Sequence, residues 1–183
     1  MTNIVFKEKI KNLYFIVIGF IPSIIFIFFS LNFLMKITRS VKSHYIKNYN
    51  DLFRGIRFKK KNILEIGIGG HDLEHYKGGS LLMWKHYFLF SNIYGLDIIN
   101  KNFNFFPRIN SFVGSQNSKE TLNKILEKMK TVDVIIDDGS HYNQHIFFTF
   151  KFFFQHLSND GIYIIEDIKM PFSDIVSDQP LES

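Results

Sequence analysis

Two groups of acidic side chains and one histidine are the residues of this sequence best suited to chemistry. Asp137 and Asp138 follow a short apolar run, with His141 three residues later, and Glu166 and Asp167 follow a second apolar run. If the two runs are neighbouring strands of a parallel sheet, four carboxylates and an imidazole meet at the carboxyl ends of these strands. Close carboxylates repel one another, and hard oxygen ligands favour Mg²⁺, Ca²⁺ or Mn²⁺ over zinc. The sequence therefore predicts a divalent metal site with a histidine placed to take a proton from a hydroxyl group.

The same residues also allow a purely structural interpretation. Asp137, Asp138 and Ser140 precede a predicted helix that begins near residue 142, and short polar side chains often cap the first turn of a helix. In that case they would satisfy backbone N–H groups instead of holding an ion. Both interpretations stay open here, and the metal site is favoured.

A glycine-rich turn carries the second candidate site. Glu65 is followed by Gly67 and Gly69, and residues without a side chain let a ligand approach the backbone closely. The dinucleotide fingerprint GxGxxG needs a third glycine where this chain has Asp72, so NAD binding is disfavoured. Asp97 ends the next apolar run, where an acidic side chain can accept both hydroxyl groups of a ribose. The turn and Asp97 together favour an adenosine-type cofactor without a pyrophosphate.

A parallel sheet is needed to bring these residues together, and the sequence predicts one. Short apolar runs alternate with stretches of helical length, which is typical of parallel strands with right-handed crossovers. The predicted strands are 61–67, 92–97, 108–113, 132–137 and 161–166, and the predicted helices are 79–88, 118–130 and 143–157. Ser118 is the expected N-cap of the second helix. The expected fold class is α/β, with a Rossmann-like open parallel sheet.

The composition excludes several other classes of protein. The 183 residues suffice for one domain and an appendage. The absence of cysteine excludes a disulfide framework, a thiolate zinc site, an iron–sulfur cluster and a cysteine nucleophile. Of the 22 Lys and Arg residues, 12 lie in residues 1–61, together with only 2 of the 17 Asp and Glu residues. The predicted sheet domain is therefore acidic, and we expect no nucleic-acid partner.

An uncharged apolar segment near the N-terminus predicts a membrane anchor. Residues 13–35 (LYFIVIGFIPSIIFIFFSLNFLM) carry no charge, and a helix of that length spans the hydrocarbon core of a bilayer. The alternatives are a cleaved signal peptide and a buried or interfacial helix, but basic residues follow the segment instead of a small-residue cleavage site. The basic excess on its C-terminal side favours a cytoplasmic C-terminal domain. We therefore expect a single-pass membrane protein with a short basic tail (1–12), a transmembrane helix (13–35), a basic juxtamembrane linker (36–61) and the sheet domain (62–183).

Five strings of this sequence resemble a known family. They are ILEIGIGG, KGGSLLMWKHYF, IYGLDI, VDVIIDDGSHYNQH and GIYIIEDI, all between Asn62 and Ile168. This region resembles class I S-adenosylmethionine-dependent methyltransferases, in particular the macrocin and mycinamicin sugar O-methyltransferase group. The resemblance implies methyl transfer from S-adenosylmethionine to a hydroxyl group of a sugar or glycosylated substrate, with Mg²⁺ as a second cofactor.

The resemblance also implies roles for individual residues. The implied cofactor-binding residues are Glu65, Gly67 and Gly69 in the turn, Asp97 at the ribose, Ser115 and Gln116 near the adenine, and Asp137. The implied metal ligands are Asp138, Glu166 and Asp167, and His141 matches the general base.

The sequence departs from the family pattern after the fifth strand. Only 16 residues follow Asp167, so we expect the last strands of the family's sheet to be missing and the fifth strand to lie at an exposed edge. A homo-oligomer, in which a second copy of the chain covers that edge, is therefore a hypothesis for the assembly. The alternative function is that of a non-catalytic or truncated methyltransferase-like membrane protein that binds the cofactor or a partner.

Overall fold

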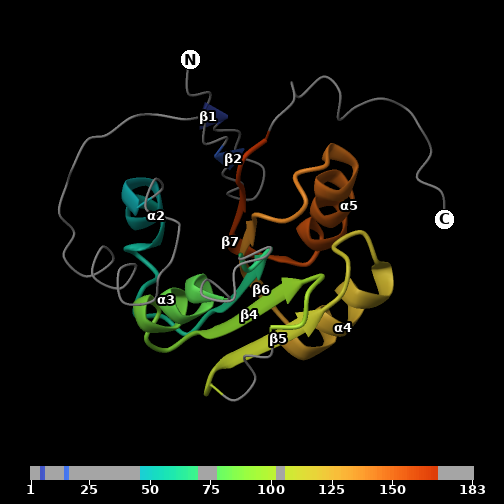
Figure 1. Cartoon of the computed structure of the whole chain (residues 1–183). Helices are drawn as coiled ribbons and strands as arrows, with labels where there is room; N and C mark the ends of the chain where they lie inside the picture. Colours follow the sequence, from blue (N-terminus) through green and yellow to red (C-terminus); the bar gives the residue numbers. More distant parts are fainter. Residues whose placement is uncertain (1–4, 7–14, 17–45, 70–77, 102–105, 169–183) are drawn as a thin grey trace.

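A parallel five-stranded sheet forms the centre of the structure (Figure 1). This computed structural model describes residues 5–6, 15–16, 46–69, 78–101 and 106–168. The strands are β3 (Asn62–Ile66), β4 (Asn92–Asp97), β5 (Ile109–Val113), β6 (Val132–Asp137) and β7 (Leu157–Ile165). Their order is β5-β4-β3-β6-β7, and every neighbouring pair is parallel. The predicted open parallel sheet is confirmed, and its fifth predicted strand, β7, lies at an edge.

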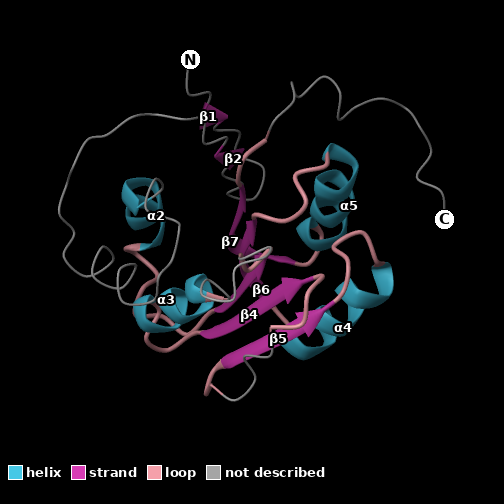
Figure 2. Ribbon diagram, in the orientation of Figure 1, coloured by secondary structure: helices cyan, strands magenta, loops and turns pink. Residues whose placement is uncertain are grey.

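Helices cover both faces of this sheet (Figure 2). The helices α2 (Ile46–Phe53) and α3 (Gly79–Tyr87) pack on one face, and α4 (Lys119–Met129) and α5 (Asn143–Phe154) pack on the other. Successive strand residues alternate between the two cores: Ile63 and Ile93 belong to the first, and Leu64 and Tyr94 to the second. A sheet covered on both faces needs apolar side chains at successive positions, which explains the continuous apolar runs of the sequence.

The last strand is longer than the sequence predicted. β7 begins at Leu157 instead of residue 161, and α5 ends at Phe154 instead of residue 157. Val132 pairs with Leu157 whereas Val134 pairs with Ile162, so the extra residues of β7 lie at an irregularity in the ladder. The segment 158–161 reads Ser-Asn-Asp-Gly, a composition typical of turns, which is why the sequence indicated a connection there.

Helix α2 belongs to the core, although the sequence analysis placed residues 36–61 in a linker. Tyr49 and Phe53 have no exposed surface. Their rings lie 5.0 and 5.7 Å from the ring of Trp84 in α3, in edge-on contacts that add to the energy of burial. The linker was predicted from the basic residues around α2, and the sequence pattern gave these two aromatic side chains no weight. The domain therefore includes residues before the predicted boundary at residue 62.

The N-terminal part of the described structure consists of two short strands. β1 (Val5–Phe6) pairs antiparallel with β2 (Phe15–Ile16). Because the backbone of residues 15–16 pairs with another strand, the transmembrane helix predicted over 13–35 is wrong at these two residues, and its other residues lie outside the described ones. Among the residues that the structure describes, no helix has the length and apolar character to cross a membrane.

The turn after β3 requires Gly67. Its φ of +76° is a conformation that side chains with a Cβ rarely adopt. A Cβ at this position would also overlap the backbone carbonyl of Asp138. The Gly67 N–H donates to the carbonyl oxygen of Leu96 at 2.8 Å, which joins the turn to β4. Glycine is therefore needed here for both conformation and space.

We expect Gly67→Ala to lower the free energy of unfolding by about 2 kcal/mol or more, because the positive φ and the overlap both oppose a side chain. Gly55→Ala is the matched control, since a Cβ at Gly55 would meet no atom within 4 Å. Urea unfolding followed by circular dichroism measures both variants. Equal stabilities of the two variants would contradict the role of Gly67.

Candidate functional site

Backbone hydrogen bonds between the strands continue beyond their carboxyl ends. Ile66 of β3 lies opposite Asp137 of β6, and Asp137 lies opposite Ile165 of β7. One residue further along, the Asp138 N–H donates to the carbonyl of Ile66 and the Glu166 N–H donates to the carbonyl of Asp137, both at 2.9 Å. The acidic residues that follow β6 and β7 therefore start from adjacent points at one edge of the sheet, as predicted.

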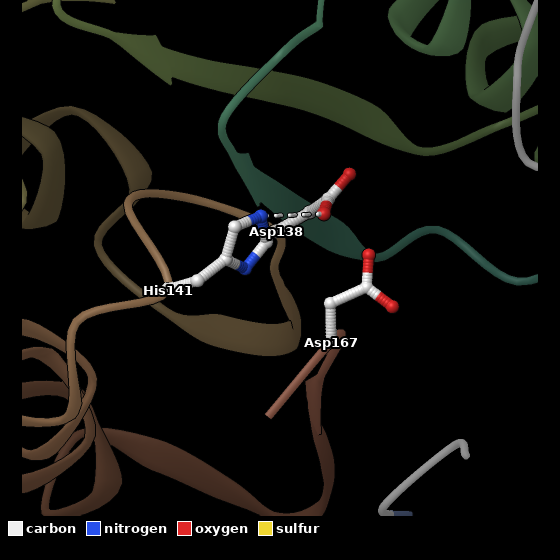
Figure 3. Close-up of side chains that lie close together, drawn as sticks. All are labelled: Asp138, His141 and Asp167. Atoms are coloured by element: carbon white, nitrogen blue, oxygen red, sulfur yellow. Dashed lines mark ion pairs between the residues drawn. The ribbon is translucent and has the colours of Figure 1, made fainter. Parts of the chain in front are cut away.

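Asp138, His141 and Asp167 form a cluster at this edge (Figure 3). One carboxylate oxygen of each aspartate and one ring nitrogen of the histidine all lie within 4.8 Å of one another. The Nε2 atom of His141 lies 3.8 Å from Oδ1 of Asp138. Asp138 and His141 are half-buried and Asp167 is exposed, so the cluster is accessible from solvent.

Two residues of the cluster have an uncommon backbone conformation. The φ angle is +59° at His141 and +50° at Asp167. Such conformations cost on the order of 1–3 kcal/mol outside glycine, and they persist where the surrounding structure determines them, frequently at functional sites. The cluster is thus assembled at a cost in conformational energy.

The cluster fits a divalent cation. Two carboxylates and an imidazole are ligands that such ions accept, and their mutual spacing allows one ion to contact all three. The Nδ1 atom of His141 is buried and has no hydrogen-bond partner among the described residues. No hydrogen bond to this nitrogen therefore fixes the tautomer in the described structure, and the ring can serve as a ligand or as a proton acceptor.

Glu166, the third predicted metal ligand, is not part of this cluster. It is 2% exposed, and its Oε1 accepts a hydrogen bond from the hydroxyl group of Tyr49 in α2. Burial raises the pKa of Tyr49 well above its usual value, and the charges of Glu166, Glu65 and Asp138 raise it further. Tyr49 therefore stays protonated and acts as a donor close to three carboxylates. Tyr49 was not predicted as a site residue, because no local pattern separates it from the other residues of the predicted linker.

The acidic residues near the glycine turn are bonded to neighbouring elements. Glu65 is buried, and its Oε2 accepts a hydrogen bond from Ser80 Oγ in α3 at 2.6 Å. Asp97 accepts hydrogen bonds from the N–H groups of Ile68 at 3.1 Å and Ile99 at 2.9 Å. Asp97 therefore joins the turn after β3 to the end of β4, where the cofactor site was predicted.

Lys101 lies against the same turn. Its Nζ is 2.7 Å from Oδ2 of Asp97 and donates to the carbonyl oxygen of Gly69, and its side chain is almost fully buried. Gly69 has a φ of +74°, which a glycine adopts without strain. The carboxylate predicted to hold a ribose is thus paired with a lysine that the sequence analysis did not identify. A spacing of four residues predicts an ion pair on a helix, but Asp97 and Lys101 do not lie on one, so the sequence gave little indication of this pair.

Gln116 and Asp137 form a buried network behind the cluster. The Nε2 of Gln116 donates to Oδ1 of Asp137 at 3.2 Å, and the Ser140 N–H donates to Oε1 of Gln116 at 2.7 Å. The hydroxyl of Tyr163 donates to Oδ2 of Asp137 at 3.4 Å. Burial raises the pKa of Asp137 to about 7, although hydrogen bonds from Gly139 and Gln116 oppose the shift. Asp137 thus lies in the interior, whereas Asp138 lies in the accessible cluster.

The helix-capping interpretation of these residues is wrong for Asp137 and Asp138. The N-cap of α5 is Tyr142, and no side chain caps this helix. The Oγ of Ser140 accepts a hydrogen bond from the N–H of Tyr142 at 3.4 Å and lies 2.9 Å from Nδ1 of His145, so Ser140 contacts the first turn of the helix. The remaining predicted cofactor residue, Ser115, accepts a hydrogen bond at 3.1 Å from the N–H of residue 117 and shapes the loop after β5.

Comparison with known proteins finds similar proteins, but no family model matches the chain. The chain is 42% identical over 121 residues to demethylmacrocin O-methyltransferase of Streptomyces fradiae. It is 41% identical over 121 residues to mycinamicin VI 2''-O-methyltransferase of Micromonospora griseorubida. Each match covers 66% of this chain, but 31% and 30% of those proteins. The chain thus matches less than a third of the length of these relatives.

A solved structure shares both the fold and the sequence similarity. It is the MycE methyltransferase from the mycinamycin biosynthetic pathway, in complex with Mg, SAH and mycinamycin VI. The match has a TM-score of 0.70 at 38% identity, and it covers 75% of this chain and 39% of that one. The matched region of this chain is therefore related, in sequence and in fold, to the macrocin and mycinamicin sugar O-methyltransferases of the class I S-adenosylmethionine-dependent methyltransferases.

Proposed function

We propose that this chain carries the S-adenosylmethionine- and Mg²⁺-binding domain of an O-methyltransferase that acts on a hydroxyl group of a sugar or glycosylated substrate. One observation carries the proposal: Asp97 at the end of β4 and the Asp138–His141–Asp167 cluster, which follows β6 and β7, lie at the carboxyl ends of the strands, on opposite sides of β3 and its glycine turn. Ligands of parallel α/β sheets bind at this edge. The related MycE structure, which contains Mg, SAH and mycinamycin VI, supports the assignment.

The Asp97 side of the turn suits the nucleoside part of the cofactor. Asp97 would accept the ribose hydroxyl groups, and Gly67 and Gly69 would let the cofactor lie against the backbone. Ser115 and Gln116 follow β5, the neighbour of β4, and would lie near the adenine. The cofactor would therefore lie at the carboxyl ends of β3, β4 and β5, and the metal ion at the carboxyl ends of β6 and β7.

The acidic cluster suits activation of the acceptor. Asp138 and Asp167 would hold Mg²⁺ together with Glu166, and bound Mg²⁺ makes a nearby hydroxyl group more acidic. His141 lies beside these carboxylates and would accept the hydroxyl proton. S-adenosylmethionine, if bound at Asp97 and the glycine turn, would supply the methyl group to the hydroxyl oxygen and would leave as S-adenosylhomocysteine. His141 would keep the hydroxyl proton.

His141→Ala tests the assignment of the base. We expect methyl transfer by the full chain to fall at least about 100-fold, the lower end of typical general-base contributions, with an unchanged Kd for S-adenosylmethionine. Formation of S-adenosylhomocysteine with a panel of sugar-bearing acceptors measures transfer, and calorimetry measures binding. His156→Ala is the control, because this histidine is exposed after the end of α5. Transfer by His141→Ala at the wild-type rate would show that another group takes the proton.

The buried Asp137 predicts a pH dependence of stability. Its folded-state pKa of about 7 lies above the ordinary value of 3.8, so the folded chain holds this proton more tightly than the unfolded chain. The stabilisation from that proton is complete below about pH 4 and is lost as the pH rises through about 7. An asparagine at this position keeps an oxygen that accepts from Gln116 and Gly139 but does not titrate.

We therefore expect Asp137→Asn to flatten the pH profile. Between pH 4 and pH 8, the wild-type free energy of unfolding should fall by up to about 4 kcal/mol more than that of the variant. Urea unfolding in the presence of EDTA measures the difference. Asp51→Asn, at an exposed position of α2, should keep the wild-type slope. Identical slopes for wild type and Asp137→Asn would contradict the buried, proton-binding environment.

We also propose, from the sequence, that the N-terminal segment anchors the chain in a membrane with its domain in the cytoplasm. The uncharged run over residues 13–35 and the basic residues after it support this proposal. Since residues 15–16 are extended, the helix would begin after them. A helix over residues 17–35 rises about 28 Å, close to the thickness of the hydrocarbon core.

Alkaline carbonate extraction of membranes tests the anchor. We expect the full chain to stay in the pellet, because a spanning helix resists extraction. The double variant Ile24→Lys, Ile27→Lys places two charges in the apolar run and should move to the supernatant. Release of the wild-type chain under the same conditions would contradict membrane insertion.

A further inference from the structure

Tyr49 connects α2 to Glu166, at the carboxyl end of the sheet where the acidic cluster lies. Its ring lies 5.4 Å from the ring of Phe53 and 5.0 Å from that of Trp84, and the residue has no exposed surface. Its hydroxyl donates a hydrogen bond to Glu166, which is 117 residues away in the sequence. The ring is thus held by the aromatic core while its one polar atom reaches the site.

Packing alone does not explain a tyrosine at this place. A phenylalanine ring would fill the same space between Phe53 and Trp84 without the cost of removing a hydroxyl group from water. The hydroxyl instead donates to Glu166, the residue before Asp167 of the cluster. A hydrogen bond to a carboxylate is stronger than one between neutral groups, and it fixes the carboxylate in place.

We propose that Tyr49 is a positioning residue of the metal site: its hydroxyl fixes the carboxylate of Glu166, the residue before Asp167, so that uptake of a divalent ion depends on α2. This inference rests on the proposed function, in which Glu166 is a metal ligand. Carboxylates that bind metals are usually hydrogen-bonded in turn, and loss of such a partner typically lowers metal affinity roughly 10- to 100-fold. A segment outside the predicted domain would therefore be part of the site.

A purely structural role makes a different prediction. If the bond from Tyr49 to Glu166 only stabilised the fold, its loss would lower the free energy of unfolding and leave the ion affinity of the folded protein unchanged. The ion affinity therefore separates the two roles, and it can be measured without any methyl acceptor.

Tyr49→Phe removes only the hydroxyl group, and Tyr87→Phe is the matched control. Tyr87 is fully buried in the same aromatic core, but its hydroxyl donates to Oδ1 of Asn50 at 3.4 Å instead of to a carboxylate. Mn²⁺ binding to the full chain, followed by electron paramagnetic resonance, and Mg²⁺ binding, followed by calorimetry, give the affinities. We expect the Kd for either ion to rise at least about tenfold in Tyr49→Phe and by less than about twofold in Tyr87→Phe. The Kd for S-adenosylmethionine should be unchanged in both.

The outcomes separate this inference from the proposed function. An ion affinity of folded Tyr49→Phe within about twofold of wild type would overturn the inference and leave the proposed function standing. A wild-type chain that binds neither ion would overturn both. If Tyr49→Phe does not fold, Glu166→Gln is compared with the double variant Tyr49→Phe, Glu166→Gln. The inference expects that Glu166→Gln lowers the ion affinity at least about tenfold and that the double variant lowers it no further, because Tyr49 acts through this carboxylate. An unchanged affinity of Glu166→Gln, or a further loss in the double variant, would overturn the inference.

Discussion

The backbone ladder that joins β3, β6 and β7 is the interaction on which the site depends. Its last bonds run from Asp138 to Ile66 and from Glu166 to Asp137. Because parallel strands in register end together, residues far apart in the sequence leave the sheet at neighbouring points. Gly67, which follows β3, lets the backbone of Asp138 pass close to the turn, since any side chain at Gly67 would occupy the space of the Asp138 backbone.

Strand alternation gives two adjacent carboxylates different environments. Asp137, the last residue of β6, points into the interior and is bonded to Gln116 and Tyr163, whereas Asp138 lies in the accessible cluster. The buried network of Asp137 and Gln116 also helps to position Asp138. Gln116 binds the backbone of Ser140, and this holds the loop after β6 close to the end of β5. The buried network therefore supports the chain segment that carries the accessible ligands.

The sheet could be predicted from the sequence because its central strands β3, β4 and β6 are buried on both faces and therefore appear as apolar runs. β4 and β6 have the predicted bounds, and the acidic residues after β6 and β7 were found because they follow such runs. Features that depend on tertiary packing had no local signal. Helix α2 looked like a charged connector, and the bond from Tyr49 to Glu166 joins residues that only the fold brings together. The pairing of Lys101 with Asp97 was missed for the same reason.

The central claim is that one edge of this sheet binds both a methyl donor and a divalent ion. Calorimetric titration of the full chain with S-adenosylmethionine, with Mg²⁺ present and then after EDTA, tests it most directly. The account predicts saturable binding of one cofactor per chain, with an additional binding heat for Mg²⁺ that EDTA abolishes. Absence of any saturable heat from a sample that circular dichroism shows to be folded would contradict it.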